Sequence, residues 1–69
     1  MTTTLHASLR HAILNGDAWR CGRIAETLRF RFGWDYDRTF KFAHAICGVD
    51  LPEWDALLYE AGELEEPTP

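Results

Sequence analysis

The segment from Arg29 to Asp37 constrains the fold of this chain more than any other, because aromatic and charged residues alternate in it around a single glycine. In an extended backbone, residues at every second position share one face, so the rings would line up on one side of a strand. A helical backbone would instead end at Gly33, since glycine is unfavourable inside helices and favoured just past their ends. The segment therefore forms either a strand over residues 28–36 or two helices joined at Gly33.

The residues before this segment favour the helical interpretation. One predicted helix face carries the apolar residues Cys21, Ile24, Ala25, Leu28 and Phe32, which follow the helical spacing. A lone strand would also need a second chain to pair with. We therefore predict an all-α fold, a compact bundle of four short helices. The predicted helices cover about residues 5–15, 18–32, 36–47 and 51–61.

Each predicted helix begins at a side chain that can accept a hydrogen bond from a free backbone N–H group. These predicted caps are Thr4, Asp17, Asp35 or Asp37, and Asp50. Asp50 and Glu53 have the spacing of a capping box. Beyond Gly62 the chain is acidic and contains proline, so we predict one domain over residues 1–62 and a disordered acidic tail over residues 63–69.

The length of the chain, 69 residues, is near the lower limit for a core that folds unaided, and its nine aromatic residues can supply much of that core. No apolar run is long enough to cross a membrane, and the first residues lack the features of a signal peptide, so a cytoplasmic location is expected. Cys21 and Cys47 fall inside helical patterns, which favours two reduced thiols, with a disulfide as the alternative.

The charges are divided along the chain. The net charge is −4, yet every lysine and arginine precedes residue 42, and every charge from Asp50 onward is negative. Such a division suits an electrostatically steered partner or head-to-tail self-association. The alternative is an ordinary solvated surface.

A hydrophobic–glycine–aromatic loop, Phe32-Gly33-Trp34, joins the second and third predicted helices. Together with the helix spacing from about Arg20 to Glu60, it resembles the ubiquitin-associated type of three-helix domain. That resemblance implies recognition of another protein through the three loop residues. The alternative is that Trp34 simply packs over the junction between the helices.

A second resemblance is to the helix-turn-helix of bacterial repressors, through the segment Ile24-Ala25-Glu26-x-Leu28. It implies a recognition helix over residues 36–47 that presents Arg38, Lys41 and His44. However, carboxylates at the start of that helix would repel DNA phosphates. The strand alternative would instead resemble the ribbon-helix-helix dimers. The expected nucleic-acid contacts are the arginines of residues 20–31, namely Arg20, Arg23, Arg29 and Arg31.

Neither catalysis nor metal binding has a clear motif. The best metal trio is Cys21, His44 and Cys47, which lacks a fourth nitrogen or sulfur ligand. Ser8 is the only serine and has no evident base, and there is no glycine-rich phosphate loop. We therefore expect no enzyme activity, no metal and no cofactor.

The combined pattern predicts a small protein–protein interaction module, such as a regulator, inhibitor or accessory subunit. Nucleic-acid binding through the front-half arginines is the alternative function, and a homodimer is compatible with both. The charge reversal and the aromatic residues around Gly33 place the expected contact surface there. Its predicted residues are Arg29, Arg31, Trp34, Asp35 and Asp37.

Overall fold

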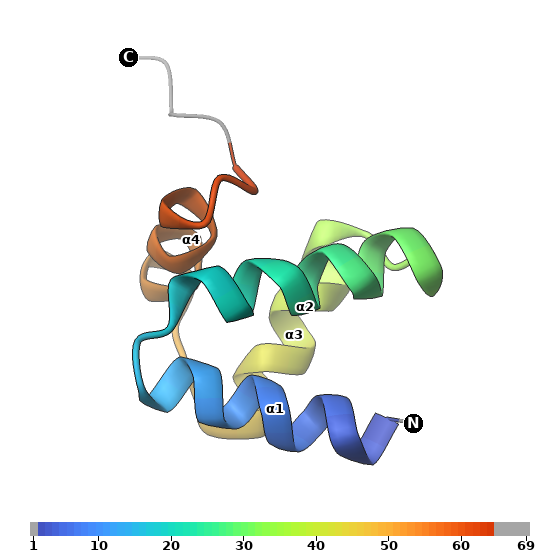
Figure 1. Cartoon of the computed structure of the whole chain (residues 1–69), viewed down its shortest axis with the longest axis horizontal. Coiled ribbons are helices and arrows are strands. Elements are labelled where there is room, and N and C mark those ends of the chain that lie inside the picture. The colour runs from blue at the N-terminus through green and yellow to red at the C-terminus, as the bar shows by residue number, and fades with distance from the viewer. Residues whose placement is uncertain (1, 65–69) are drawn as a thin grey trace.

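The computed structural model describes residues 2–64, which form four helices and, within that range, no strand. The helices are α1 (Thr2–Leu14), α2 (Ala18–Arg31), α3 (Tyr36–Cys47) and α4 (Leu51–Glu60), shown in Figure 1. The predicted all-α bundle is confirmed. The alternative of a strand over residues 28–36 is wrong, because α2 continues through Arg31.

Gly33 ends α2 as a left-handed residue with φ of 72°. The backbone N–H of Trp34 then donates to the carbonyl of Leu28 at 3.1 Å, which satisfies an otherwise free acceptor at the helix end. Only glycine adopts this φ without steric cost. The alternating aromatic residues are therefore divided between the end of one helix, a turn and the start of the next.

Three aspartates begin the last three helices as predicted. Asp17, Asp35 and Asp50 each accept a hydrogen bond from the backbone N–H three residues later, at 3.2, 2.8 and 3.0 Å. The first predicted start is wrong, since α1 begins at Thr2 and Thr4 lies inside it. A helix that starts at the surface needs no side-chain cap, because its first N–H groups can bind water.

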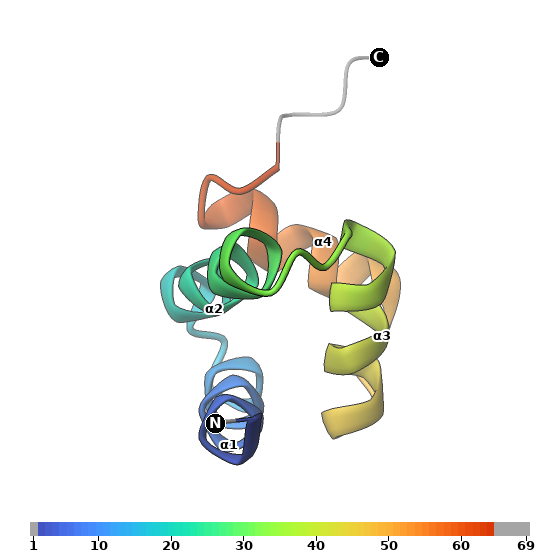
Figure 2. The ribbon, with the colours of Figure 1, turned by 90° about the vertical axis from the view of Figure 1, so that its right-hand side faces the viewer.

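α2 is the central element of the bundle. It runs antiparallel to α1 and contacts α1, α3 and α4 (Figures 1 and 2). Trp54 of α4 is the largest fully buried side chain. The apolar side chains of the buried core are Leu9, Ala12, Ile13, Cys21, Ile24, Ala25, Leu28, Ala43, Val49, Trp54 and Leu58.

Most of the expected acidic tail, residues 65–69, lies outside the described residues, but Leu64 is described and packs against the core. Cys21 is buried, Cys47 is half-buried, and both are free thiols. Within the described residues, no helix is long and apolar enough to cross a membrane.

Candidate protein-binding surface

The side of α2 that faces away from the core carries two large aromatic residues. Trp19 is 63% exposed and Phe30 is 73% exposed. They are separated by about three helical turns, so they lie on the same face, with Arg23 and Glu26 between them. We call these four residues, Trp19, Arg23, Glu26 and Phe30, the outer α2 stripe.

An arginine side chain lies over part of each ring. The guanidinium carbon of Arg23 lies 5.3 Å from the ring centre of Trp19, and that of Arg29 lies 5.5 Å from the ring centre of Phe30. At an exposed site each cation–π contact is worth about 0.5–1 kcal/mol, enough to bias these long side chains toward one arrangement. The stripe thus presents aromatic rings and cations in a partly ordered pattern.

Arg20 and Arg31 lie on the flank of α2 that faces α1. Arg31 lines a shallow hollow with Thr4, Leu5, Thr27 and Phe32. Arg20 lines a second hollow and forms an ion pair with Asp17 at 3.5 Å.

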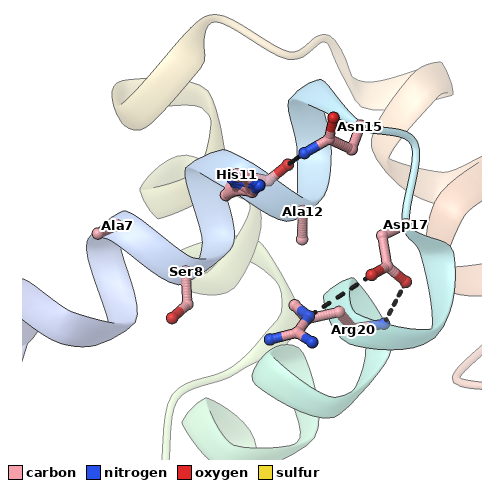
Figure 3. A pocket seen from close by; sticks show the side chains of 7 residues that line it. All are labelled: Ala7, Ser8, His11, Ala12, Asn15, Asp17 and Arg20. Atoms are coloured by element: carbon pink, nitrogen blue, oxygen red, sulfur yellow. Dashed lines mark hydrogen bonds and ion pairs between the residues drawn. The ribbon is translucent and has the colours of Figure 1, made fainter.

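Figure 3 shows this second hollow, which lies between α1 and the start of α2. Asn15 closes one end, where its side-chain amide donates to the carbonyl of His11 at 2.8 Å. The side chains of Ser8 and His11 point in different directions, so His11 is not placed to act as a base for Ser8 (Figure 3).

On the side of the stripe toward α4, the carboxyl group of Glu63 lies beside that of Glu26. Burial raises the pKa of Glu63, and a hydrogen bond to Glu26 and the charge of Glu26 raise it further. The charges of Arg29 and Arg23 act in the opposite direction. The residues after α4 thus return to α2 and complete the edge of the outer α2 stripe.

Trp34, the centre of the predicted contact surface, is half-buried at the junction of α2 and α3. Its ring makes an edge-to-face contact with Phe42, with centroids 5.2 Å apart, and lies 6.3 Å from the ring of Phe32. The guanidinium of Arg38 lies over the ring at 4.5 Å. Trp34 therefore packs within its own chain, and Arg38 covers part of what remains.

The other four predicted contact residues are distributed over the molecule. Asp35 caps α3, and Asp37 forms an exposed ion pair with Lys41 at 2.9 Å. Arg29 and Arg31 lie on opposite flanks of α2, the first toward Glu63 and the second toward α1. Of the five, only Arg29 contacts the outer α2 stripe.

The residues of the expected DNA-recognition helix are also engaged within the chain. Arg38 stacks on Trp34, Lys41 pairs with Asp37, and the Nδ1 of His44 donates to the carbonyl of Val49 at 2.9 Å. Across residues 2–64, no group of three His, Cys, Asp or Glu side chains is placed to hold a metal ion. The ribbon-helix-helix alternative requires a strand over residues 28–36, but these residues form the end of α2, the turn after it and the first residue of α3.

Sequence reasoning missed Trp19 and Phe30, although a signal for them was present. Trp19, Arg23 and Phe30 follow the spacing i, i+4, i+11, which places them opposite the buried Cys21 and Leu28. Aromatic residues on the polar face of an amphipathic helix are the feature that points to a contact surface.

Comparisons with protein-family models, with curated proteins and with solved structures find no match for this chain. The resemblance of the Phe32-Gly33-Trp34 loop to ubiquitin-associated domains gains no support from them. A functional assignment for this four-helix protein therefore depends on the geometry of its surface.

Proposed function

We propose that this protein is a non-catalytic protein-binding module whose contact surface is the outer α2 stripe. The observation that carries the proposal is the exposure of Trp19 and Phe30 on one helix face, each with an arginine over part of its ring. Tryptophan and arginine are the residue types most enriched among those that dominate binding energy at protein interfaces.

The energetics of such a contact are favourable. Covering a large exposed aromatic ring removes apolar surface from water and contributes on the order of 2 kcal/mol when the ring enters a pocket. The contacts of Arg23 and Arg29 with the rings reduce the freedom that these side chains would lose on binding. Two anchors about 16 Å apart on one rigid helix suit a partner with two matching apolar pockets.

The charge of the surface defines the chemistry of the partner. Four arginines lie on or beside the stripe, and the acidic residues are Glu26 within it and Asp17 and Glu63 beside it, so the balance of charge is positive. A partner with apolar pockets bordered by carboxylates would complement this pattern and would be steered toward it.

The experiment is capture of partners from nuclease-treated native lysate by immobilised protein, quantified by mass spectrometry. The double variant Trp19→Ala/Phe30→Ala should lose a protein that the unmodified chain retains. The matched control is Leu14→Ala, because Leu14 is 64% exposed at the end of α1 and lies off the stripe. Equal retention by the double variant, with its helical circular dichroism unchanged, would overturn the proposal.

Nucleic-acid binding remains the second candidate, because Arg20, Arg23, Arg29 and Arg31 all lie on one helix beside rings that could stack on bases. The ion pair of Arg20 with Asp17 and the carboxyl groups beside the stripe weaken this alternative. It requires steep salt dependence and loss of affinity when Arg20 and Arg23 are both replaced. Retained material that disappears after nuclease treatment would favour it.

A further inference from the structure

We propose that the partner of the outer α2 stripe is a second copy of this chain, which docks through the outer face of α4. This inference rests on the proposed function, because it requires the stripe to bind protein. It names the partner from the surface chemistry of the chain itself.

The outer face of α4 is apolar in its centre and acidic at its border. Trp54 and Leu58 point into the core, and the residues at i, i+4 and i+7 on the opposite side are all exposed. These residues are Pro52, Ala56 and Tyr59, and we call them the outer α4 face. Tyr59 is 44% exposed, and the exposed carboxylates of Glu53 and Glu60 lie beside this face.

The two surfaces are complementary in charge. Arg23 and Arg29 lie about 9 Å apart along α2 and about a third of a turn apart around it, whereas Glu53 and Glu60 lie about 10.5 Å apart along one side of α4. The guanidinium group of Arg23, within the stripe, can therefore meet one of these carboxylates of another copy. The ring of Tyr59 would then lie between the aromatic ends of the stripe, where ring–ring contact adds to the burial of apolar surface.

The charges on these surfaces have no ion-pair partner within the described part of the chain. Between residues 2 and 64, the ion pairs join Arg20 to Asp17 and Lys41 to Asp37. None of them uses a carboxylate of α4, and none uses Arg23 or Arg29. The carboxylates of α4 can therefore pair with a second molecule, and so can Arg23 and Arg29, which contact aromatic rings in their own chain and lie near Glu63.

The two surfaces of one molecule do not meet each other. α2 and α4 already pack together through their inner sides, with Gly22 against Ala61, so their outer faces point away from that contact. Any contact between them must join different copies. Because the two faces are different, the contact is heterologous, and each added copy leaves one face of each kind free.

The test uses two variants, each of which removes one face. Trp19→Ala/Arg23→Glu removes the stripe, and Tyr59→Ala/Glu60→Arg removes the outer α4 face. Sedimentation velocity should show the unmodified chain growing beyond a dimer as its concentration rises, and each variant alone remaining a monomer. An equal mixture should form dimers and grow no further, since each variant still supplies the face that the other lacks.

The contrary outcomes are distinct. If one variant associates on its own, the contact uses its remaining face twice and the inference is wrong. If the unmodified chain associates but the mixture of variants does not, the contact does not join these two faces and the inference is also wrong. If the unmodified chain stays monomeric at every concentration in low salt, the inference also fails. In that case, capture of a different protein that still depends on Trp19 and Phe30 would leave the proposed function standing. If the unmodified chain neither self-associates nor captures another protein through Trp19 and Phe30, both this inference and the proposed function are overturned.

Salt provides an independent readout of the same contact. An interface between arginines and carboxylates should weaken by at least about tenfold between low salt and about 0.5 M salt, because exposed charge pairs are screened. Leu14→Ala should associate like the unmodified chain. Association that strengthens with salt would show a purely apolar contact and would contradict the assignment of the carboxylates.

Discussion

Gly22 in α2 lies directly against Ala61, the residue that caps the end of α4. A β-carbon placed on Gly22 would overlap with the β-carbon of Ala61 and would lie 3.1 Å from the Cγ of Glu63. Glycine inside a helix costs about 1 kcal/mol relative to alanine, so this position gives up helix stability in exchange for close approach of the two helices.

Gly22→Ala should therefore destabilise the protein, although alanine is the better helix former. We expect a loss of about 1–3 kcal/mol in the free energy of unfolding, as for other overpacked sites, measured by urea denaturation. The exchange variant Gly22→Ala/Ala61→Gly should recover much of the loss, because it moves the methyl group to the other side of the same contact. If Gly22→Ala stabilised the protein, the close packing of Gly22 against Ala61 would be contradicted.

Trp54 should be indispensable for folding. It is fully buried, and Trp54→Ala should cost about 3–5 kcal/mol. That is a large part of the roughly 3–10 kcal/mol expected for a domain of this size. Circular dichroism should show that Trp54→Ala is largely unfolded at room temperature. The control is Trp19→Ala, the same substitution at a 63% exposed site, which should change stability by about 1 kcal/mol or less.

Cys21 should be chemically inert in the folded protein. Burial is the main cause that raises the pKa of its thiol to about 11, with further contributions from the charges of Asp17 and Cys47. Since the thiolate is the reactive form, labelling by a disulfide reagent at neutral pH should be slow for Cys21 in a Cys47→Ser variant and should become fast in denaturant. Rapid labelling of that folded variant would contradict the burial.

The raised thiol pKa also has a consequence for stability at alkaline pH. The folded state holds the thiol proton more tightly than the unfolded state does. Stability should therefore fall as the pH rises from the ordinary value of 9.0 through about 11. Cys21→Ala lacks this titration, so the difference in melting temperature between the two proteins should change over that interval.

Glu63 should make stability depend on pH in the acidic range. Burial and the neighbouring Glu26 raise its pKa above 4.5 in the folded state, so the folded protein favours the protonated form. Its favourable contribution is complete below the unfolded pKa and is lost as the pH rises through the folded one. Glu63→Gln should be more stable than the unmodified protein at about pH 7 and should lose that advantage near about pH 3.5.

The matched control for this titration is Glu60→Gln, which removes one negative charge from an exposed position on α4. Thermal unfolding of both variants over the same pH range separates the local effect from that of net charge. If Glu63→Gln and Glu60→Gln show the same pH dependence, the contact with Glu26 is not responsible.

The helices were predictable from local chemistry. Asp17, Asp35 and Asp50 mark helix starts, and Gly33 marks an end, because capping and left-handed backbone conformations involve only neighbouring residues. Phe32 shows the limit of such reasoning. Periodicity placed it in the buried stripe of α2, but it follows the last helical residue and is 44% exposed.

The surface was less predictable, because it depends on contacts between distant segments. Whether Trp34 is exposed depends on Phe42, eight residues away along the chain, and on how α3 crosses the end of α2. Leu64 was assigned to a disordered tail from composition, yet it packs on the core. No local sequence pattern predicts these contacts between distant segments.

The central place of α2 separates two kinds of evolutionary constraint. Its inner residues contact all three other helices, so a change there disturbs the whole molecule. Its outer residues are exposed, and exposed substitutions typically change stability by about 0.5 kcal/mol or less. Selection can therefore remodel Trp19, Arg23 and Phe30 for a new partner while the bundle beneath them stays intact.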